Sequence, residues 1–352
     1  MKLKTKALRE AVDYASRIIR STQNPMASFI KISPIGSRLS ITSTNLDEFL
    51  IQYIDIAEAS AEGFSACLVQ PRHVLAALYL AGDEVEIKQE KSGLVIQSAA
   101  TVKVKTADAD EFPAIPDYPL VGKKEAPCVE LAAGIKAVQF CAHNNPARAE
   151  LCSIHFQSDS GKMVVEATDG ANGAFHQFDW AGELSFLVSA EHSSRLAEAF
   201  SMDGAELFLT GNLVAVKHKL GSYACKLLEA KYPNTSAMRN GEKFSAKKPL
   251  GTINAECVTD TLSAALMLCD ANQLPAMTVE FTPKAIQFKS DSFHRGLDGK
   301  FEKHSTKVNA QALKKCFSAF GSEMVNIGTG ELDFIRLESG KLSVLTMSLR
   351  EA

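Results

Sequence analysis

Apolar and polar residues follow two patterns along this chain, one typical of helices and one typical of strands. The two patterns occur in a fixed order. Residues 183–228 begin with a short apolar strand at 186–188, and an amphipathic run follows at 190–200, after a polar cap at Ser189. Apolar positions three and four residues apart indicate one face of a helix, whereas strict alternation indicates a half-buried strand. Three alternating segments complete the stretch, at 205–209, 213–217 and 222–228.

The same order of strand, helix and three strands recurs on both sides of this stretch. Residues 66–106 show this order, and Pro71 lies at the first position of the helix, a position that favours proline. Residues 305–349 show it as well, with Asn309 as the helix cap. A further helix with three strands precedes each copy, and these helices are predicted at 5–21, 131–142 and 258–270. Such recurrence indicates an internal repeat. We therefore predict three domains, at 1–118, 126–240 and 247–352.

In each of the three domains, the middle strand of the first half ends in a hydroxyl residue followed by Asn or Asp. The pairs are Thr44-Asn45, Thr168-Asp169 and Ser290-Asp291. Both kinds of side chain bond to nearby backbone groups, so each pair predicts an ordered turn at the end of its strand.

The predicted fold class is α+β, in which each domain packs two helices on antiparallel strands. A helix with its side chains is about 10 Å wide, so six helices side by side cover about 60 Å of arc. A ring around a nucleic-acid duplex needs an inner circumference of about 100 Å, which is about twelve helices. Two copies arranged head to tail satisfy this geometry.

Composition narrows the class of protein without fixing its function. The 352 residues are 46% apolar and 22% charged, and the net charge of −3 gives no bulk attraction to nucleic acid. The eight cysteines include no C-x-x-C pair, which favours buried thiols in a reducing cytosol over zinc or redox use. No secretory segment and no membrane span are found, so we expect a cytoplasmic protein without a membrane partner.

Five segments, in order along the chain, resemble the bacterial DNA polymerase III beta subunit family, the sliding clamps. They are residues 107–113 (ADADEFP), 148–151 (RAEL), 166–170 (EATDG), 227–233 (LLEAKYP) and 344–350 (VLTMSLR). Their spacing is similar to that of the family and in phase with the internal repeat. The resemblance covers all three predicted domains.

This resemblance implies three repeated domains of the DNA clamp fold in a head-to-tail dimeric ring. The homodimer encircles double-stranded DNA without regard to sequence and tethers polymerase subunits and repair proteins, which raises their effective concentration at the template. Neither catalysis nor a cofactor is implied. The chain has no G-x-x-x-x-G-K-[ST] loop, so a separate clamp-loader ATPase is expected to place it on DNA.

The resemblance also implies a groove that accepts short linear peptides with apolar and aromatic anchors. Carried over by position, its residues are Leu151, Thr168, Gly170, Ala171, Asn172, Gly173, Pro233, Met238, Leu345 and Met347. The family usually continues T-D-G with His-Arg-Leu, whereas this chain has Ala-Asn-Gly, which changes the shape of the pocket. The alternative is that Leu151, Leu345 and Met347 are simply core residues of strands.

Contact with DNA is expected from the polar faces of the helices. The basic residues predicted there are Lys6, Arg9, Arg17, Arg20, Arg72, Lys136, Arg195, Lys314 and Lys315. The resemblance adds Asn145 and Arg148 from the loop after the second domain's first helix. Contacts of this kind go to phosphates and depend on salt. The alternative for each residue is an ordinary solvated helix face, and the helix at 258–270 has no Lys or Arg at all.

For the dimer, the resemblance implies that an edge strand of the first domain meets the third domain of a second copy. This places Val102 against Leu268 and Cys269. An exposed edge strand needs such a cover. The alternative is that Leu268 is buried within its own domain.

Two other functions remain open from the sequence. One is a monomeric clamp-like adaptor or decoy that binds clamp partners without encircling DNA. The other is a metal-dependent hydrolase that uses His143, His155, Asp169 and His176, although these residues lack the spacing of H-E-x-x-H. Gel filtration distinguishes a monomer from a ring, and metal analysis tests the hydrolase.

Overall fold

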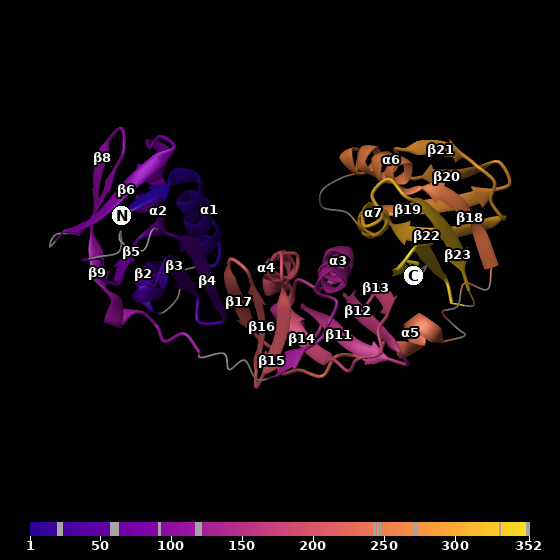
Figure 1. Ribbon diagram of the computed structural model, residues 1–352. Coiled ribbons are helices and arrows are strands. Elements are labelled where there is room, and N and C mark those ends of the chain that lie inside the picture. The colour runs from indigo at the N-terminus through magenta and orange to yellow at the C-terminus, as the bar shows by residue number, and fades with distance from the viewer. Residues whose placement is uncertain are drawn as a thin grey trace. The chain divides into compact units, whose positions relative to one another are not determined.

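The computed structural model describes residues 1–19, 24–56, 63–90, 93–116, 122–241, 244, 246, 248–269, 274–330 and 332–349 (Figure 1). Helices are combined with antiparallel sheets in this part of the chain, which confirms the α+β class. Two compact units are present. Unit 1 comprises Met1–Cys128 and Glu198–Lys226, and unit 2 comprises Val129–Ala197 and Leu227–Ala352. The three domains expected from the repeat remain a prediction.

In the described residues of unit 1, two antiparallel sheets accompany the helices α1 (Thr5–Ser16) and α2 (Pro71–Tyr79), which pack against each other. The smaller sheet has the order β1-β6-β7-β8, and the larger has the order β10-β15-β16-β17-β4-β3-β2-β5-β9. The strand bounds are β1 Lys2–Lys4, β2 Ile30–Ile35, β3 Arg38–Thr44, β4 Glu48–Asp55, β5 Cys67–Val69, β6 Glu84–Glu90, β7 Gly93–Gln97, β8 Thr101–Val104, β9 Thr106–Asp108, β10 Lys123–Lys124, β15 Glu206–Thr210, β16 Leu213–His218 and β17 Gly221–Lys226.

The larger sheet of unit 1 is continuous because β17 pairs with β4, which is more than 150 residues away along the chain. At this junction the buried carboxylate of Glu48 accepts a hydrogen bond of 2.6 Å from the Tyr223 hydroxyl and one of 2.8 Å from Asn45 Nδ2. Beside it, Phe49, Phe208 and Ala224 share one apolar cluster. Two groups of strands that the sequence presents separately therefore form one sheet.

Helix α1 has the predicted apolar face but is shorter than predicted. Leu8, Val12 and Ala15 are fully buried, as expected from their spacing. The helix ends at Ser16 rather than at residue 21, because the next amide groups bond three residues back, from Arg17 to Tyr14 and from Ile19 to Ser16. This tighter turn buries Ile18, whereas a continued helix with Leu8, Val12 and Ala15 on one face would bury Ile19 instead.

Unit 2 repeats the design with an eight-stranded sheet, β14-β11-β12-β13-β25-β24-β23-β18, and a four-stranded sheet, β21-β20-β19-β22. The strand bounds are β11 Ser153–Asp159, β12 Lys162–Thr168, β13 Asn172–Asp179, β14 Ser185–Ser189, β18 Lys248–Asn254, β19 Ala276–Thr282, β20 Ala285–Lys289, β21 His294–Asp298, β22 His304–Asn309, β23 Met324–Thr329, β24 Phe334–Ser339 and β25 Leu342–Met347. The helices are α3 Cys128–Val138, α4 Ala190–Phe200, α5 Ser236–Asn240, α6 Ala255–Met267 and α7 Ala310–Ser318.

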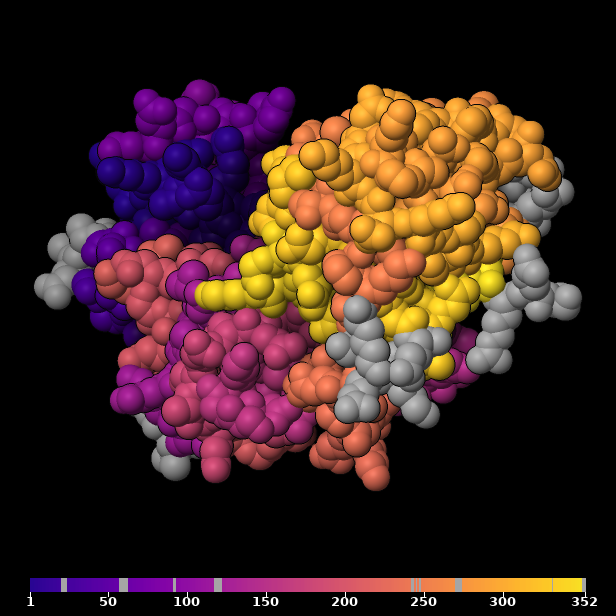
Figure 2. Space-filling view, turned by 90° about the vertical axis from the view of Figure 1, so that its right-hand side faces the viewer, coloured from indigo at the N-terminus to yellow at the C-terminus, as the bar shows by residue number. Residues whose placement is uncertain are grey.

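A second long-range strand pairing joins two groups of strands into the larger sheet of unit 2. Strand β25 pairs with β13, so that Gly173 lies opposite Leu345 and Asn172 lies opposite Thr346. Figure 2 shows this contact at the surface, where yellow C-terminal residues lie against the magenta segment that contains β12 and β13. Helices α6 and α7 lie side by side (Figure 1); α6 contacts β18 and β21, and α7 contacts β22 and β25.

Several predicted bounds in unit 2 need correction. Helix α6 runs from Ala255 to Met267 instead of 258–270, because Asn254 caps it by accepting a hydrogen bond of 3.2 Å from the Cys257 amide. Helix α3 ends at Val138, and the predicted helical residues after it form a 3₁₀ turn, Gln139–Cys141. Regular elements flank the predicted boundary between the second and third domains: α5 ends at Asn240 and β18 begins at Lys248. Within the described residues, no helix is both long and apolar enough to cross a membrane.

Candidate functional site

The turn between β12 and β13 is held rigidly by its own side chains. One oxygen of Asp169 accepts hydrogen bonds from the amides of Ala171 (2.9 Å) and Asn172 (2.7 Å), and the other accepts from Asn172 Nδ2 (2.7 Å). Thr168 Oγ1 accepts a bond of 3.1 Å from the Gly170 amide. Gly170 has a φ of +93°, a conformation that favours glycine. The E-A-T-D-G segment therefore forms an ordered turn at the end of β12, with Gly170 in the turn.

Some of the ten predicted groove residues come together around this turn. Thr168, Gly173 and Leu345 form one row across three strands, through the β12–β13 and β13–β25 pairings. The thioether end of Met238 covers Gly173, since a Cβ atom on this glycine would be 3.2 Å from Met238 Cε. Likewise, a Cβ atom on Gly170 would be 3.8 Å from Leu151 Cδ1.

The ten residues do not line one cavity. Ala171, Asn172 and Met347 line a cavity of about 380 Å³ between the β12–β13 turn, the end of β25 and the start of α7. Pro233 lines a separate cavity of about 630 Å³. Leu345 and Leu151 are only 1% and 6% exposed, which fits the alternative that they belong to the core.

Sequence reasoning missed other residues that line the smaller cavity. They are Phe140, Cys141, Asp169, Asn309, Gln311, Ala312, Lys315, Cys316, Thr346, Ser348 and Leu349. Asn309 carried a local signal as the predicted helix cap, Asp169 carried one as part of the predicted turn, and Lys315 was predicted only as a DNA-facing residue. In the structure Asn309 Oδ1 accepts hydrogen bonds from the amides of Gln311 (2.9 Å) and Ala312 (3.1 Å). The approach of α7 to the turn has no local signal in the sequence.

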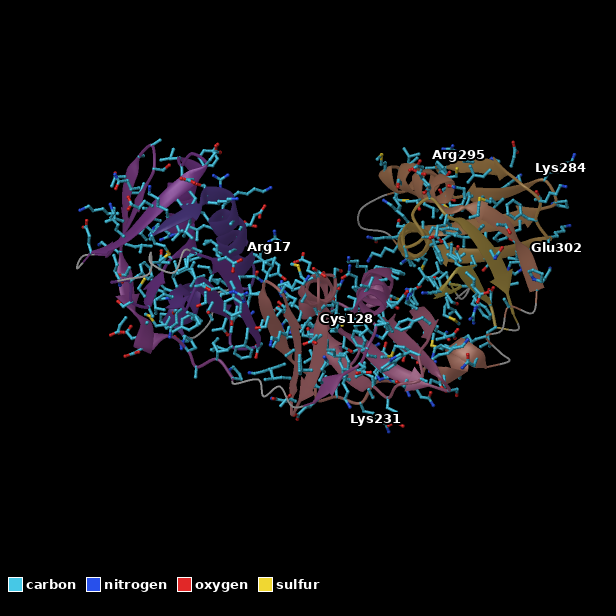
Figure 3. The ribbon with its side chains drawn as sticks, viewed as in Figure 1. Arg17, Cys128, Lys231, Lys284, Arg295 and Glu302 are labelled. Carbon is cyan, nitrogen blue, oxygen red and sulfur yellow. The ribbon has the colours of Figure 1, made fainter. Side chains whose placement is uncertain are left out.

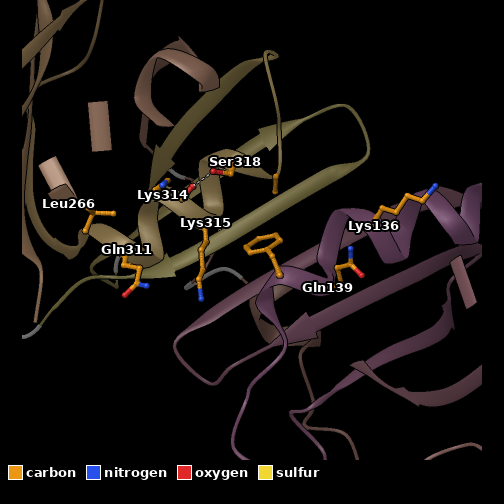
Figure 4. Close-up of a pocket in the computed structure, with 9 residues that line it drawn as sticks. Lys136, Gln139, Leu266, Gln311, Lys314, Lys315 and Ser318 are labelled. Atoms are coloured by element: carbon orange, nitrogen blue, oxygen red, sulfur yellow. Dashed lines mark hydrogen bonds between the residues drawn. The ribbon is translucent and has the colours of Figure 1, made fainter. Parts of the chain in front are cut away.

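A second cavity, of about 400 Å³, brings three predicted DNA-facing lysines together. Lys136 comes from α3, and Lys314 and Lys315 come from α7 (Figure 4). The remaining lining residues are Gln139, Phe140, Leu266, Gln311, Ser318 and Ala319, so none of the described lining residues is acidic. Figure 4 shows the Lys136 side chain directed away from the two α7 lysines, so the three residues add positive charge near one cavity without converging on a single point. Such charge suits phosphate groups despite the negative net charge.

Most of the other predicted DNA-facing residues bond to their own chain. Arg17, at the end of α1 in Figure 3, pairs with Asp13 at 3.0 Å and with Glu198 at 3.6 Å. The remaining interactions are Lys6 with Glu10 at 3.8 Å, Arg9 with the Leu78 carbonyl, Arg72 with Gln70 at 2.9 Å and Arg195 with the Glu191 carbonyl at 3.0 Å. These bonds are at the surface and do not prevent contact with phosphate. Arg20 lies outside the described residues.

The two residues that the resemblance added lie in one short 3₁₀ turn, Pro146–Arg148. Asn145 caps this turn, because its Oδ1 accepts a bond of 3.0 Å from the Ala147 amide. Arg148 is exposed, and its guanidinium reaches the β12–β13 turn, where Nη1 lies 3.5 Å from the Cβ position of Gly170. The loop therefore lies beside the candidate groove.

The predicted dimer residues lie on an edge strand of unit 1 and on a helix end of unit 2. Val102 is half-buried in β8, an edge strand. Leu268 is 57% exposed just after α6, which contradicts the alternative that it is buried within its own domain, and Cys269 beside it is half-buried. Unit 2 also has an edge strand in β21, which carries Arg295 (Figure 3).

The four residues of the hydrolase alternative have separate partners. His143 Nδ1 accepts a hydrogen bond of 2.8 Å from the Asn145 amide, and His155 Nδ1 lies 2.8 Å from a Glu166 oxygen. Asp169 is used by its own turn, and His176 Nε2 lies 3.9 Å from a Glu130 oxygen. Burial lowers the pKa of His176 below its usual value. In the part of the chain that the structure describes, no three His, Cys, Asp or Glu side chains are placed to hold a metal ion. The geometry gives this alternative no support.

Comparison with known proteins gives consistent results for sequence and fold. Residues 1–116 match the family model of the DNA polymerase III beta subunit, N-terminal domain. The beta sliding clamp of Bacillus subtilis is 20% identical over 249 residues, a match that spans 67% of this chain and 66% of that relative.

Two solved structures illustrate the similarity of fold. The DNA polymerase III subunit beta of Pseudomonas aeruginosa is 14% identical and has a TM-score of 0.86, with 100% of both chains covered. The beta chain of Streptococcus pneumoniae is 16% identical and has a TM-score of 0.87, with 99% of both chains covered. At such identities the structures establish the fold alone, while the family model adds the evidence from sequence. Together these matches show that residues 1–116 resemble the N-terminal domain of the bacterial DNA polymerase III beta subunit in sequence, and that the whole chain has the fold of such subunits.

Proposed function

We propose that this protein is a sliding clamp: two copies close head to tail around duplex DNA and tether replication and repair proteins to the template. The observation that carries the proposal is the clamp fold over the whole chain, together with the family match of residues 1–116. The role is mechanical. It needs neither catalysis nor a cofactor, and it belongs in the cytoplasm, where the chromosome lies.

Contact with DNA is proposed to be electrostatic and independent of sequence. The cavity lined by Lys136, Lys314 and Lys315 supplies positive charge for phosphate groups. The surface arginines are held by weak exposed ion pairs, which salt screens and phosphates can replace. A sliding ring needs such loose contacts, since tight ones would stop it at one position.

Partner binding is proposed to use the groove around the β12–β13 turn. Met347 and Met238 present adaptable surface there, which suits an apolar or aromatic peptide side chain. Polymerase subunits, the clamp-loader ATPase and repair proteins are the proposed partners, each through a short linear peptide. The Ala-Asn-Gly sequence implies a different peptide preference from clamps with His-Arg-Leu.

The test is retention on DNA of different topology. The protein is loaded by a clamp loader on nicked circular DNA, and we expect it to remain bound until a restriction enzyme linearises the circle. It then leaves within the time needed to slide to an end. Release that depends on salt alone, equally for circles and linear DNA, would show surface binding without encirclement.

The second candidate is a monomeric adaptor or decoy that binds clamp partners. One observation favours it: α6 contains no Lys or Arg. It shares the groove with the main proposal but lacks the ring. The solution mass distinguishes the two.

A further inference from the structure

Residues 232–241, here called the strap, cross one face of the eight-stranded sheet of unit 2. Their only regular element is α5, a helix of five residues. Isolated helices shorter than about 12 residues are marginal in water, so α5 owes its position to contacts with the sheet. The nature of these contacts determines how firmly Pro233 and Met238 are held.

A buried ion pair joins the strap to the middle of the sheet. Glu166 on β12 has no exposed surface, and Arg239 on α5 is 6% exposed. Arg239 Nε lies 3.4 Å from Glu166 Oε2, and Arg239 Nη1 bonds to Asp159 Oδ2 at 3.0 Å. A buried charge is costly unless it is paired, so each of these two residues depends on the other.

The carboxylate of Glu166 has further partners on both sides. Its Oε2 accepts a hydrogen bond of 2.6 Å from the Thr235 hydroxyl at the start of α5. Its Oε1 lies 2.8 Å from His155 Nδ1 on the neighbouring strand. One buried carboxylate therefore holds both the beginning of α5, through Thr235, and its end, through Arg239.

The end of α5 is also held from the opposite side. The guanidinium of Arg336 on β24 donates to the carbonyl oxygens of Met238 (3.3 Å), Arg239 (3.4 Å) and Phe244 (3.1 Å). The last carbonyls of a helix lack partners within the helix, and a cation at this end is favourable. Met238 thus lies between two charged anchors and covers Gly173.

We propose that Glu166 and Arg239 are positioning residues for the peptide groove, although neither belongs to the predicted set of groove residues. Their buried pair holds the strap so that Met238 stays in place over Gly173, beside the groove. The inference rests on the proposed function, because it assigns a role within the same groove. Without the pair, the strap is ordered in only a fraction of the molecules. A peptide binds only that ordered fraction, so its apparent affinity is the intrinsic affinity multiplied by the fraction.

Hydrogen exchange of the full-length protein tests the anchoring directly. Glu166→Gln and Arg239→Met each remove the charge pair, and Thr235→Val is a milder variant that removes one hydroxyl. We expect exchange in residues 236–240 to become at least tenfold faster, with β12 and β13 unchanged. Glu130→Gln is the matched control, since it removes a carboxylate that pairs with Lys341 at 2.7 Å elsewhere in unit 2.

Binding of a fluorescein-labelled octapeptide with leucine and phenylalanine anchors tests the consequence for the groove. We expect Glu166→Gln to weaken binding about tenfold and the double variant Glu166→Gln/Arg239→Met to be no weaker than the single variants, because the pair acts as one unit. Met347→Glu, which alters the cavity beside the turn, should abolish binding.

Three results would overturn the inference: unchanged exchange in the strap, loss of protection throughout β12 and β13, or unchanged peptide affinity despite a loosened strap. The second result would show that the pair supports the whole sheet. If the wild-type protein binds no such peptide while Glu166→Gln still loosens the strap, the proposed groove is wrong and the anchoring of the strap stands.

Discussion

Single side chains explain why corresponding turns recur in the two units. Thr168 and Asp169 bond to the backbone of their own turn, and Thr44 and Asn45 do the same in unit 1. Asn45 Oδ1 accepts from the amides of Asp47 (3.0 Å) and Glu48 (2.7 Å), while Thr44 Oγ1 accepts from Leu46 (2.9 Å). A hydroxyl followed by Asn or Asp needs only local backbone groups, so the sequence predicts these two turns correctly. The third predicted pair, Ser290-Asp291, differs: the backbone of Ser290 bonds to that of Phe293, but among the described residues the Ser290 hydroxyl has no hydrogen-bond partner.

The residue-scale prediction concerns the buried carboxylate of Glu48. Tyr223→Phe removes the hydroxyl that donates to it at 2.6 Å. A hydrogen bond to a buried charged group contributes about 1.5–3 kcal/mol, so the free energy of unfolding should fall by about that amount. Urea denaturation measures it. Tyr79→Phe, at a side chain that is 81% exposed, is the control and should change nothing. Equal stability of both variants would mean that Glu48 is satisfied without Tyr223.

At the scale of elements, local caps fix where helices begin. Asn309 precedes α7 and Asn254 precedes α6, and both accept bonds from amides of the first turn. The cap of α7 was predicted from the sequence. The start of α6 was placed three residues late, because its first residues, Ala255 to Cys257, do not continue the apolar spacing that begins at Val258.

Asn309→Ala tests the capping of α7. Loss of two accepted hydrogen bonds should destabilise the protein by about 1 kcal/mol and speed amide exchange in the first turn of the helix. Asn309→Asp keeps an acceptor of the same size and should retain the wild-type values. Both are measured by denaturation and hydrogen exchange. A variant with alanine that matches the wild type would show that packing alone positions α7.

At the scale of the whole molecule, the proposed ring requires a second copy to cover exposed apolar surface. Met267 and Leu268 at the end of α6 are 84% and 57% exposed, and β8 in unit 1 is an unpaired edge. Burial of such side chains contributes about 1.5–3 kcal/mol each, which gives a dimer a reason to form.

Light scattering over a range of concentrations tests the dimer. We expect a particle of twice the 38.0 kDa chain mass for the wild type. Leu268→Asp places a carboxylate in the proposed contact and should shift the mass toward the monomer. Leu220→Asp changes a side chain in unit 1 that is equally exposed, at 57%, and should leave the dimer intact. A wild-type monomer at every concentration would instead favour the adaptor.

The sequence by itself determined the features that depend on neighbours along the chain. The period of apolar positions predicted the helices, as in α4 at Ala190–Phe200, and most of the strands. Short-range hydrogen bonding predicted the cap of α7 and the turns at Thr44 and Thr168. The resemblance of five short segments indicated the family, because these residues occur in a fixed order along the chain.

Only the tertiary structure decided which distant segments meet. The pairings of β17 with β4 and of β25 with β13 join separate groups of strands. The alternation of apolar residues in a strand predicts which face is buried, but it does not determine which other strand pairs with it. Glu166 shows, for a single residue, that the sequence pattern does not predict contacts between distant segments. In the sequence it is one charged residue in a strand, and only the strap that folds over it makes it a buried, paired carboxylate. Burial depends on what covers a residue, and that cover comes from about 70 residues farther along the chain.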